Sequence, residues 1–269
     1  MNRLLTAADG TQVIALLNQE PALNLFMLGN LEKLGFQHEL SQFWGDFADE
    51  VGEQPRLRGV INRYMTGWAL YGQPDTNWAS LAHVLDTHPI QAARLQDNPG
   101  GTSSLLPYLK RYRAALVVVE ELMELATESF RPILPKEGVR VRRATMADQD
   151  ALVAFYANAE EMTRTPPAVA RPLQDTRVWV AEQSGQIVAA ALTNAETQSL
   201  AMIGGVYTKP AARGQGLSQA VCSVLCQDLI ASGLRPVLYW GKPAAGAVYR
   251  KLGFRRIGNW RAVWLEKKE

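Results

Sequence analysis

Short runs of alternating hydrophobic and polar residues recur along the chain and predict β-strands. Between two of them, Glu182-Gln183-Ser184-Gly185 has the composition of a tight turn and predicts a hairpin. Leu217, Val221, Leu225 and Leu229 recur every four residues and predict one face of a helix. The predicted strands are 42–47, 58–71, 139–142, 177–182, 186–193, 199–208 and 236–239, then a final pair between 254 and 265. This order predicts an α/β or α+β sheet wrapped by helices.

A segment rich in proline and glycine divides the pattern into two halves. Residues 131–138 contain two prolines and a glycine between hydrophobic segments, which predicts a linker. The predicted domains are therefore 1–130 and 139–269. Shifting the first half by 139 residues lays Thr6 on Thr145 and Asp9 on Asp148, each pair at the start of a predicted helix. We interpret this as a tandem of two related domains, although capping residues also recur by chance.

Composition and charge exclude several classes of protein. Hydrophobic residues make up 47% and charged residues 20% of 269 residues, as in globular proteins. No stretch is apolar enough to span a membrane, and the segment Met1–Asp9 does not resemble a secretory signal, so we expect a cytoplasmic protein. A net charge of +2 without a dense basic run argues against nucleic acid. Cys222 and Cys226 share one predicted helix face far from any histidine, so we expect two core residues and no metal site.

The segment after the strand 199–208 has the features of an anion-binding loop. Pro210 ends the strand, and Arg213-Gly214-Gln215-Gly216 leads into the helix that begins at Leu217. Glycines let the backbone approach an anion, and a helix start offers free N–H groups. A plain glycine-rich turn is the alternative. A P-loop is excluded because no lysine follows Gly216, and the spacing of a dinucleotide-binding loop is absent.

Two motifs together are similar to the signatures of the GCN5-related N-acetyltransferase (GNAT) superfamily. The first, Arg213–Ser218, resembles Gln/Arg-x-x-Gly-x-Gly/Ala, and the second, Tyr249–Phe254, resembles Tyr-x-x-x-Gly-Phe. The resemblance covers about 130 residues, from Val139 to the end. It departs from the family at Ser218, where Gly or Ala is usual, and at Lys242, where many members have Asn. It implies a GNAT-like mixed, mostly antiparallel sheet in 139–269, and a degenerate GNAT-like copy or helper domain in 1–130.

The resemblance also implies a set of site residues for acetyl-CoA. Main-chain groups of Val206 and Thr208 would bind the pantetheine arm, and Gly204-Gly205 would form a bulge in that strand. Tyr249 would be the general acid. For the base we consider Glu196, Glu160 or Glu161, or a base that acts through water. The expected cofactor-binding residues are Val206, Tyr207, Thr208, Arg213, Gly214, Gln215, Gly216, Leu217 and Ser218.

These features predict an acetyl-CoA-dependent N-acetyltransferase in which a primary amine of a small molecule or peptide attacks the thioester directly. A non-catalytic acyl-CoA sensor or interaction module is the alternative. The first half has no Arg-Gly-x-Gly, and Gln73–Asn77 in the corresponding place offers no cation, so we expect one acetyl-CoA per chain. The interpretation allows a homodimer. It does not identify the acceptor.

Overall fold

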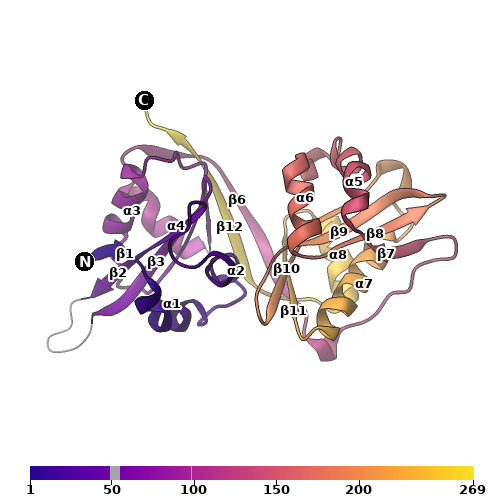
Figure 1. Ribbon diagram of the computed structural model, residues 1–269, viewed down its shortest axis with the longest axis horizontal. Helices are drawn as coiled ribbons and strands as arrows, with labels where there is room; N and C mark the ends of the chain where they lie inside the picture. The colour runs from indigo at the N-terminus through magenta and orange to yellow at the C-terminus, as the bar shows by residue number, and fades with distance from the viewer. Residues whose placement is uncertain (49–54, 98) are drawn as a thin grey trace. The chain divides into compact units, whose positions relative to one another are not determined.

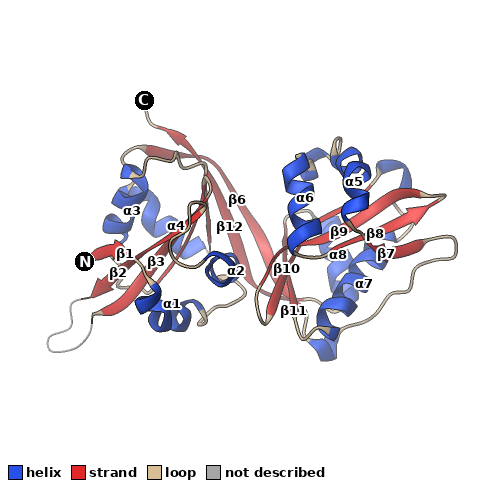
Figure 2. Ribbon diagram, in the orientation of Figure 1, coloured by secondary structure: helices blue, strands red, loops and turns tan. Residues whose placement is uncertain are grey.

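The computed structural model describes residues 1–48, 55–97 and 99–269, which form two compact units. The first unit contains Met1–Glu121 and Gly258–Glu269, and the second contains Leu122–Ile257 (Figures 1 and 2). The sequence placed the division at 131–138 and assigned all of 139–269 to one domain. The units divide elsewhere because the chain crosses from one to the other within two long strands.

The first unit is a mixed sheet with four helices. Its strands, in spatial order, are β1 (Asn2–Leu4), β2 (Ser41–Ala48), β3 (Arg56–Tyr64), β4 (Gly67–Gly72), β5 (Arg94–Asp97), β12 (Arg255–Lys267) and β6 (Tyr112–Glu124). Its helices are α1 (Gly10–Leu17), α2 (Leu25–Leu34), α3 (Trp78–Thr87) and α4 (Pro99–Leu105). The predicted strand 58–71 is in fact the hairpin β3–β4, which turns at Met65 with a positive φ of 54°.

The second unit has the same kind of sheet. From the end of β6 its strands follow in the order β11 (Arg235–Trp240), β10 (Leu200–Thr208), β9 (Gln186–Glu196), β8 (Val178–Gln183) and β7 (Arg140–Arg143). Its helices are α5 (Gln149–Tyr156), α6 (Pro166–Asp175), α7 (Leu217–Ala231) and α8 (Pro243–Leu252). Apart from the parallel pair β10–β11, the registered pairs in this sheet are antiparallel. The predicted fold class is confirmed.

The repeat at an offset of 139 residues has a structural counterpart at the start of each half. Thr6 and Asp9 form a capping box before α1, and Thr145 and Asp148 form one before α5. The aspartate is paired with an arginine in both, Arg3 with Asp9 at 2.5 Å and Arg142 with Asp148 at 2.7 Å. The same cap and ion pair at equivalent positions support the interpretation of two related halves.

The last strand of each half completes a sheet that the other half begins. In the first unit, Arg261–Trp264 of β12 pairs with Arg94–Asp97 of β5. In the second unit, the end of β6 neighbours β11, and the N–H of Leu125 donates to the carbonyl of Pro236 at 2.9 Å. The predicted pair of strands between 254 and 265 is wrong, because this segment is the single strand β12, whose partners come from the first half of the chain.

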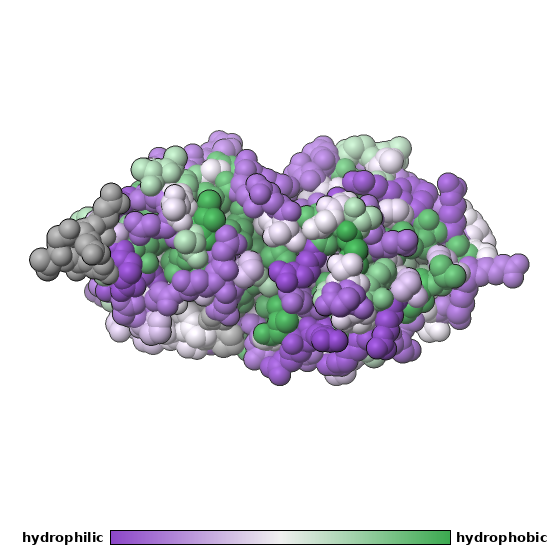
Figure 3. All heavy atoms as spheres, turned by 90° about the horizontal axis from the view of Figure 1, so that it is seen from below, coloured by the Kyte–Doolittle hydropathy of each residue, from purple (hydrophilic) through white to green (hydrophobic). Residues whose placement is uncertain are grey.

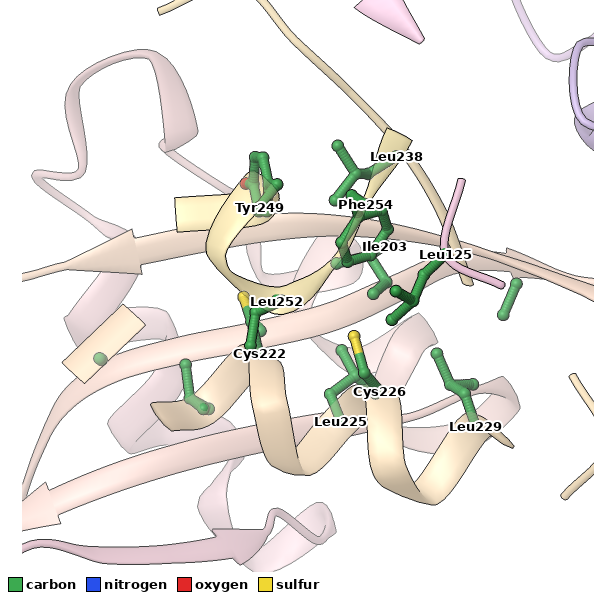
Figure 4. Close-up of a cluster of buried hydrophobic side chains, with 14 of the residues drawn as sticks. Leu125, Ile203, Cys222, Leu225, Cys226, Leu229, Leu238, Tyr249, Leu252 and Phe254 are labelled. Atoms are coloured by element: carbon green, nitrogen blue, oxygen red, sulfur yellow. The ribbon is translucent and has the colours of Figure 1, made fainter. Parts of the chain in front are cut away.

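Helices cover both faces of the sheet in the second unit. On one face α5 and α6 pack on Val178, Val180 and Tyr207. On the other face α7 and α8 pack on Ala201 and Ile203 around the labelled residues of Figure 4. Cys222 and Cys226 are free, fully enclosed thiols in that layer, so their predicted place in the core is confirmed. Burial raises the pKa of Cys222 to about 12.

On the face drawn in Figure 3, hydrophilic residues cover most of the surface of each unit and hydrophobic residues form small patches. No helix among the described residues is long and apolar enough to cross a membrane. The described residues also include no group of three or more His, Cys, Asp or Glu side chains placed to hold a metal ion.

Candidate active site

The strand β10 carries a β-bulge where the sequence predicted one. Its register against β9 shifts between Gly204 and Tyr207, which inserts one extra residue into β10. Gly205 has a φ of +58°, a conformation that glycine adopts without strain. The predicted bulge at Gly204-Gly205 is confirmed.

Beyond the bulge, β10 presents main-chain groups on the side away from β9. The N–H of Lys209 donates to the carbonyl of Val188 at 2.9 Å, so Lys209 and, by alternation, Tyr207 direct their main-chain groups to β9. Val206 and Thr208 therefore direct theirs to the opposite side. The pairing with β11 on that side covers Leu200–Met202, and β10 continues past its last pair from Ile203 to Thr208. Backbone donors and acceptors thus line an opening between the two strands.

Tyr156 fixes the orientation of the bulge. Its hydroxyl is buried and donates to the carbonyl of Gly205 at 2.5 Å. The C=O and N–H of a trans peptide point in opposite directions, so the N–H of Val206 points away from Tyr156. The sequence placed Tyr156 on the apolar face of a helix and gave no sign of this hydrogen bond. Only the fold brings α5 to a strand 49 residues further along.

The loop after β10 leaves the start of α7 open. Gly214 and Gly216 have φ values of +80° and +81°, so both are in the left-handed region that favours glycine. Gly216 is the N-cap residue and supplies no side chain to cap the helix. The first helical bond printed in the chain's own geometry is from the N–H of Ala220 to the carbonyl of Gly216 at 3.1 Å. The N–H groups of Leu217, Ser218 and Gln219 precede it and have no partner within the helix, which is the arrangement that binds anions.

Arg213 stands at the end of β10 with its charge half in solvent. Its Nε donates to the carbonyl of Thr208 at 3.3 Å, and its Nη2 pairs with Glu160 at 3.2 Å. Both side chains of this ion pair are about half exposed, 50% for Arg213 and 54% for Glu160. An exposed pair of this kind is weak, so an arriving anion can compete with Glu160 for the guanidinium.

The other predicted cofactor-binding residues fall into two groups. Ser218 is half-buried in the first turn of α7, and Gln215 is exposed and accepts a hydrogen bond from Gln183 at 2.9 Å. Leu217 and Tyr207 are instead core side chains, 3% and 7% exposed. The Tyr207 ring packs on Phe155 on the face covered by α5. Leu217 and Tyr207 can therefore meet a ligand through their main chain.

Tyr249 lies on α8 at the edge of the core layer between α8 and α7, where Figure 4 shows its ring. It is 6% exposed, and its ring meets that of Phe254 edge to face with centroids 5.9 Å apart. Ala212 and Leu217, which flank the loop Arg213–Gly216, belong to the same cluster. Lys242, one of the departures from the family pattern, is the exposed residue before α8.

Glu196 lies toward the other end of β10. It pairs with Ala201, four residues before Gly205, which at about 3.3 Å per residue is roughly 13 Å along the strand from the bulge. Its carboxylate accepts from Thr193 at 2.6 Å and pairs with Arg177 at 3.6 Å. Of the other acids considered, Glu160 is at Arg213, and the side chain of Glu161 is outside the described residues. The fold therefore brings Glu160 to the loop and holds Glu196 in a separate ion pair.

The equivalent segment of the first unit is closed. The helix α3 is capped by the side chain of Asn77, which accepts from the N–H of Ser80 at 3.1 Å. The carboxylate of Asp46 accepts from the N–H of Asn77 at 2.8 Å and adds negative charge there. The register of β3 with β4 continues without a bulge from Gly59 to Tyr64. This helix start thus satisfies its own donors and repels an anion.

Comparisons with known proteins agree with this geometry. The sequence model of the acetyltransferase (GNAT) domain family matches residues 174–256. A search of curated protein sequences finds no significant match.

Among solved structures, the chain is similar in fold to an acetyltransferase of the GNAT family from Novosphingobium aromaticivorans, with 20% identity, a TM-score of 0.57, and coverage of 78% of this chain and 89% of that one. It is also similar to a GNAT-like protein from Streptococcus suis, with 16% identity, a TM-score of 0.61, and coverage of 98% and 100%. A tandem GNAT protein from the clavulanic acid biosynthesis pathway has 13% identity, a TM-score of 0.62, and coverage of 99% and 98%. The chain therefore carries a GNAT acetyltransferase domain at residues 174–256, within a fold that it shares along its whole length with GNAT structures.

Proposed function

We propose that the second half of the chain binds acetyl-CoA along β10 and the start of α7, and transfers the acetyl group to a primary amine of a small molecule or peptide. One observation carries this proposal. The bulged strand with outward-facing groups on Val206 and Thr208 leads directly into a helix start that has no side-chain cap.

The residues of the loop fit the diphosphate of acetyl-CoA. A Cβ placed on Gly216 would meet open space, with Gln219 Oε1 the nearest atom at 3.8 Å, so a ligand can reach the backbone there. The free N–H groups of the first turn and the partial positive charge of the helix start favour an anion. Arg213 adds a full charge. Main-chain groups of Val206 and Thr208 are available for the amides of the pantetheine arm.

The chemistry requires a reactive amine and a stabilised leaving group. Acetyl-CoA supplies an acetyl thioester. An alkyl amine with a pKa of ~10.4 is only about one part in a thousand neutral at pH 7, so removal of its proton assists attack. The N–H of Val206 is oriented to donate to an oxygen that gains negative charge at the bulge. Tyr249 is our candidate to protonate the departing thiolate.

We propose that water carries the amine proton away from the site. Direct transfer to Glu196 is disfavoured, because its carboxylate already accepts from Thr193 and pairs with Arg177. It would then be a base only at the end of a water chain.

Thiol release from acetyl-CoA by the purified protein, measured against a panel of primary amines, tests the proposal. We expect release that depends on an amine, with a product heavier by one acetyl group in mass spectrometry. Acetyl-CoA binding without release for any amine or peptide would contradict the enzymatic function and favour the acyl-CoA-binding module.

A further inference from the structure

The guanidinium of Arg164 lies against the bulge of β10. Arg164 comes just before α6, and its Nη2 donates to Asn194 Oδ1 at 3.2 Å. The Asn194 side chain in turn fills the space that a Cβ on Gly204 would need. A Cβ on Gly205 would come within 3.0 Å of Arg164 Nη2. The charge of Arg164 therefore stands at the position where the proposed function places the reacting groups.

This charge has neutral partners. Besides Asn194, Arg164 donates from Nη1 to the carbonyl of Ala168 at 3.4 Å, and it stacks on the ring of Tyr156 at 5.6 Å. Within the described ranges no carboxylate pairs with it. Burial is the main cause that lowers the pKa of Arg164, and the nearby charge of Arg171 lowers it further. Arg142, by contrast, is held between two carboxylates, Asp148 and Glu182.

A half-buried guanidinium without a counter-charge is costly to maintain, since burial removes hydration that no anion replaces. A guanidinium has five N–H donors in a planar fork, and the two bonds above use one from each terminal nitrogen. The remaining donors suit the two oxygens of a carboxylate. A ligand carboxylate bound here would place an amine on the same small molecule beside the bulge.

We propose that Arg164 binds the carboxylate of the acceptor, so that the substrate class is amines that carry a carboxylate near the amino group, such as free amino acids. This inference rests on the proposed function, because the acetyl group must be delivered at the bulge. Arg164 selects and orients the acceptor and takes no part in proton transfer.

Wild-type protein tests the inference without any substitution. Amino acids are compared as acceptors with their decarboxylated amines and their amides, each pair having the same side chain. A site built around a charged hydrogen-bonding group rejects analogues that lack the partner, so we expect kcat/KM to be about 10²-fold higher for the carboxylates. Equal values across all pairs would overturn the inference while leaving the acetyltransferase function in place.

Two variants then assign the effect to this residue. Arg164→Met should raise KM for the amino acid acceptor about 10²-fold, leave the activity with the amide unchanged, and leave acetyl-CoA affinity unchanged in calorimetry. Arg164→Lys should recover part of the loss. Arg143→Met is the matched control, because Arg143 is exposed and its printed bond is to the carbonyl of Thr176 at 3.4 Å.

A binding measurement separates the two proposals. Titration of the amino acids into the acetyl-CoA complex should show binding that Arg164→Met weakens. If no amine is acetylated but this Arg164-dependent binding persists, the enzymatic proposal fails and the carboxylate site stands. If Arg164→Met binds and acetylates the amino acids as wild type does, the carboxylate site is refuted.

Discussion

Gly216→Val tests the loop on which the proposed function depends. Gly216 has a φ of +81°, and a residue with a Cβ in this left-handed region loses about 1–2 kcal/mol of stability. A Cβ there would point into open space and clash with nothing in the protein. We therefore expect Gly216→Val to fold, with its free energy of unfolding reduced by that amount. Its effect on acetyl-CoA should be larger, because the branched side chain would stand where the diphosphate approaches the helix start.

The expected loss of affinity follows from the bonds at the helix start. Losing two hydrogen bonds to a charged group, at about 1.5 kcal/mol each, weakens binding by about 3 kcal/mol, or more than 10²-fold in Kd. Calorimetric titration with acetyl-CoA measures this directly. Chemical denaturation of the same preparations measures the stability.

Gly233→Val is the matched control. Gly233 follows the other end of α7, has a φ of +77°, and a Cβ there would also meet nothing within 4 Å. Both variants should lose similar stability, and only Gly216→Val should lose acetyl-CoA. Wild-type affinity in Gly216→Val, or an equal loss in Gly233→Val, would refute the assignment of the loop.

Three further predictions concern the acid, the first half and an ion pair. Tyr249→Phe should lower kcat roughly 10²-fold with unchanged acetyl-CoA affinity, because general acid catalysis contributes about 10²–10⁴; unchanged kcat in an assay limited by chemistry would leave Tyr249 a packing role. Titration of the intact protein should give one acetyl-CoA per chain, since Asn77 and Asp46 close the equivalent helix start; a stoichiometry near two would contradict this. The hydrogen bond from Arg142 lowers the pKa of Asp148 to about 2, below its unfolded value of about 3.9. The pair therefore stabilises the fold above about pH 4 and is lost as the pH falls toward 2, so the difference in urea midpoint between wild type and Asp148→Asn should shrink from pH 5 to pH 3.

Local sequence features predicted much of the second unit, because they act over a few residues. Ser184 and Gly185 have φ values of +48° and +74°, as the predicted tight turn between β8 and β9 requires. Gly204-Gly205 marked the bulge, and Pro210 with the glycines after it marked the end of β10 and the open start of α7.

Features that join distant segments were beyond the sequence. Nothing near Tyr156 indicates that its hydroxyl reaches Gly205, and nothing near Arg164 indicates that it lies at the same bulge. The sequence also predicted a turn within 254–265, but β12 runs through Gly258 as one strand. A β-strand pattern specifies which residues face the core, and it does not specify which partner strand will bind.

The exchange of last strands has a consequence for how this protein is made. The sheet of the first unit needs residues 258–269, so it stays open at β5 until synthesis has reached the end of the chain. Domains usually fold as they emerge from the ribosome, N-terminal domain first. Here the first-made half waits for the last-made strand, and its unpaired edge is meanwhile available to other strands. A gene cut at the middle would leave two incomplete sheets, so the two halves are bound to be inherited, synthesised and degraded as one polypeptide.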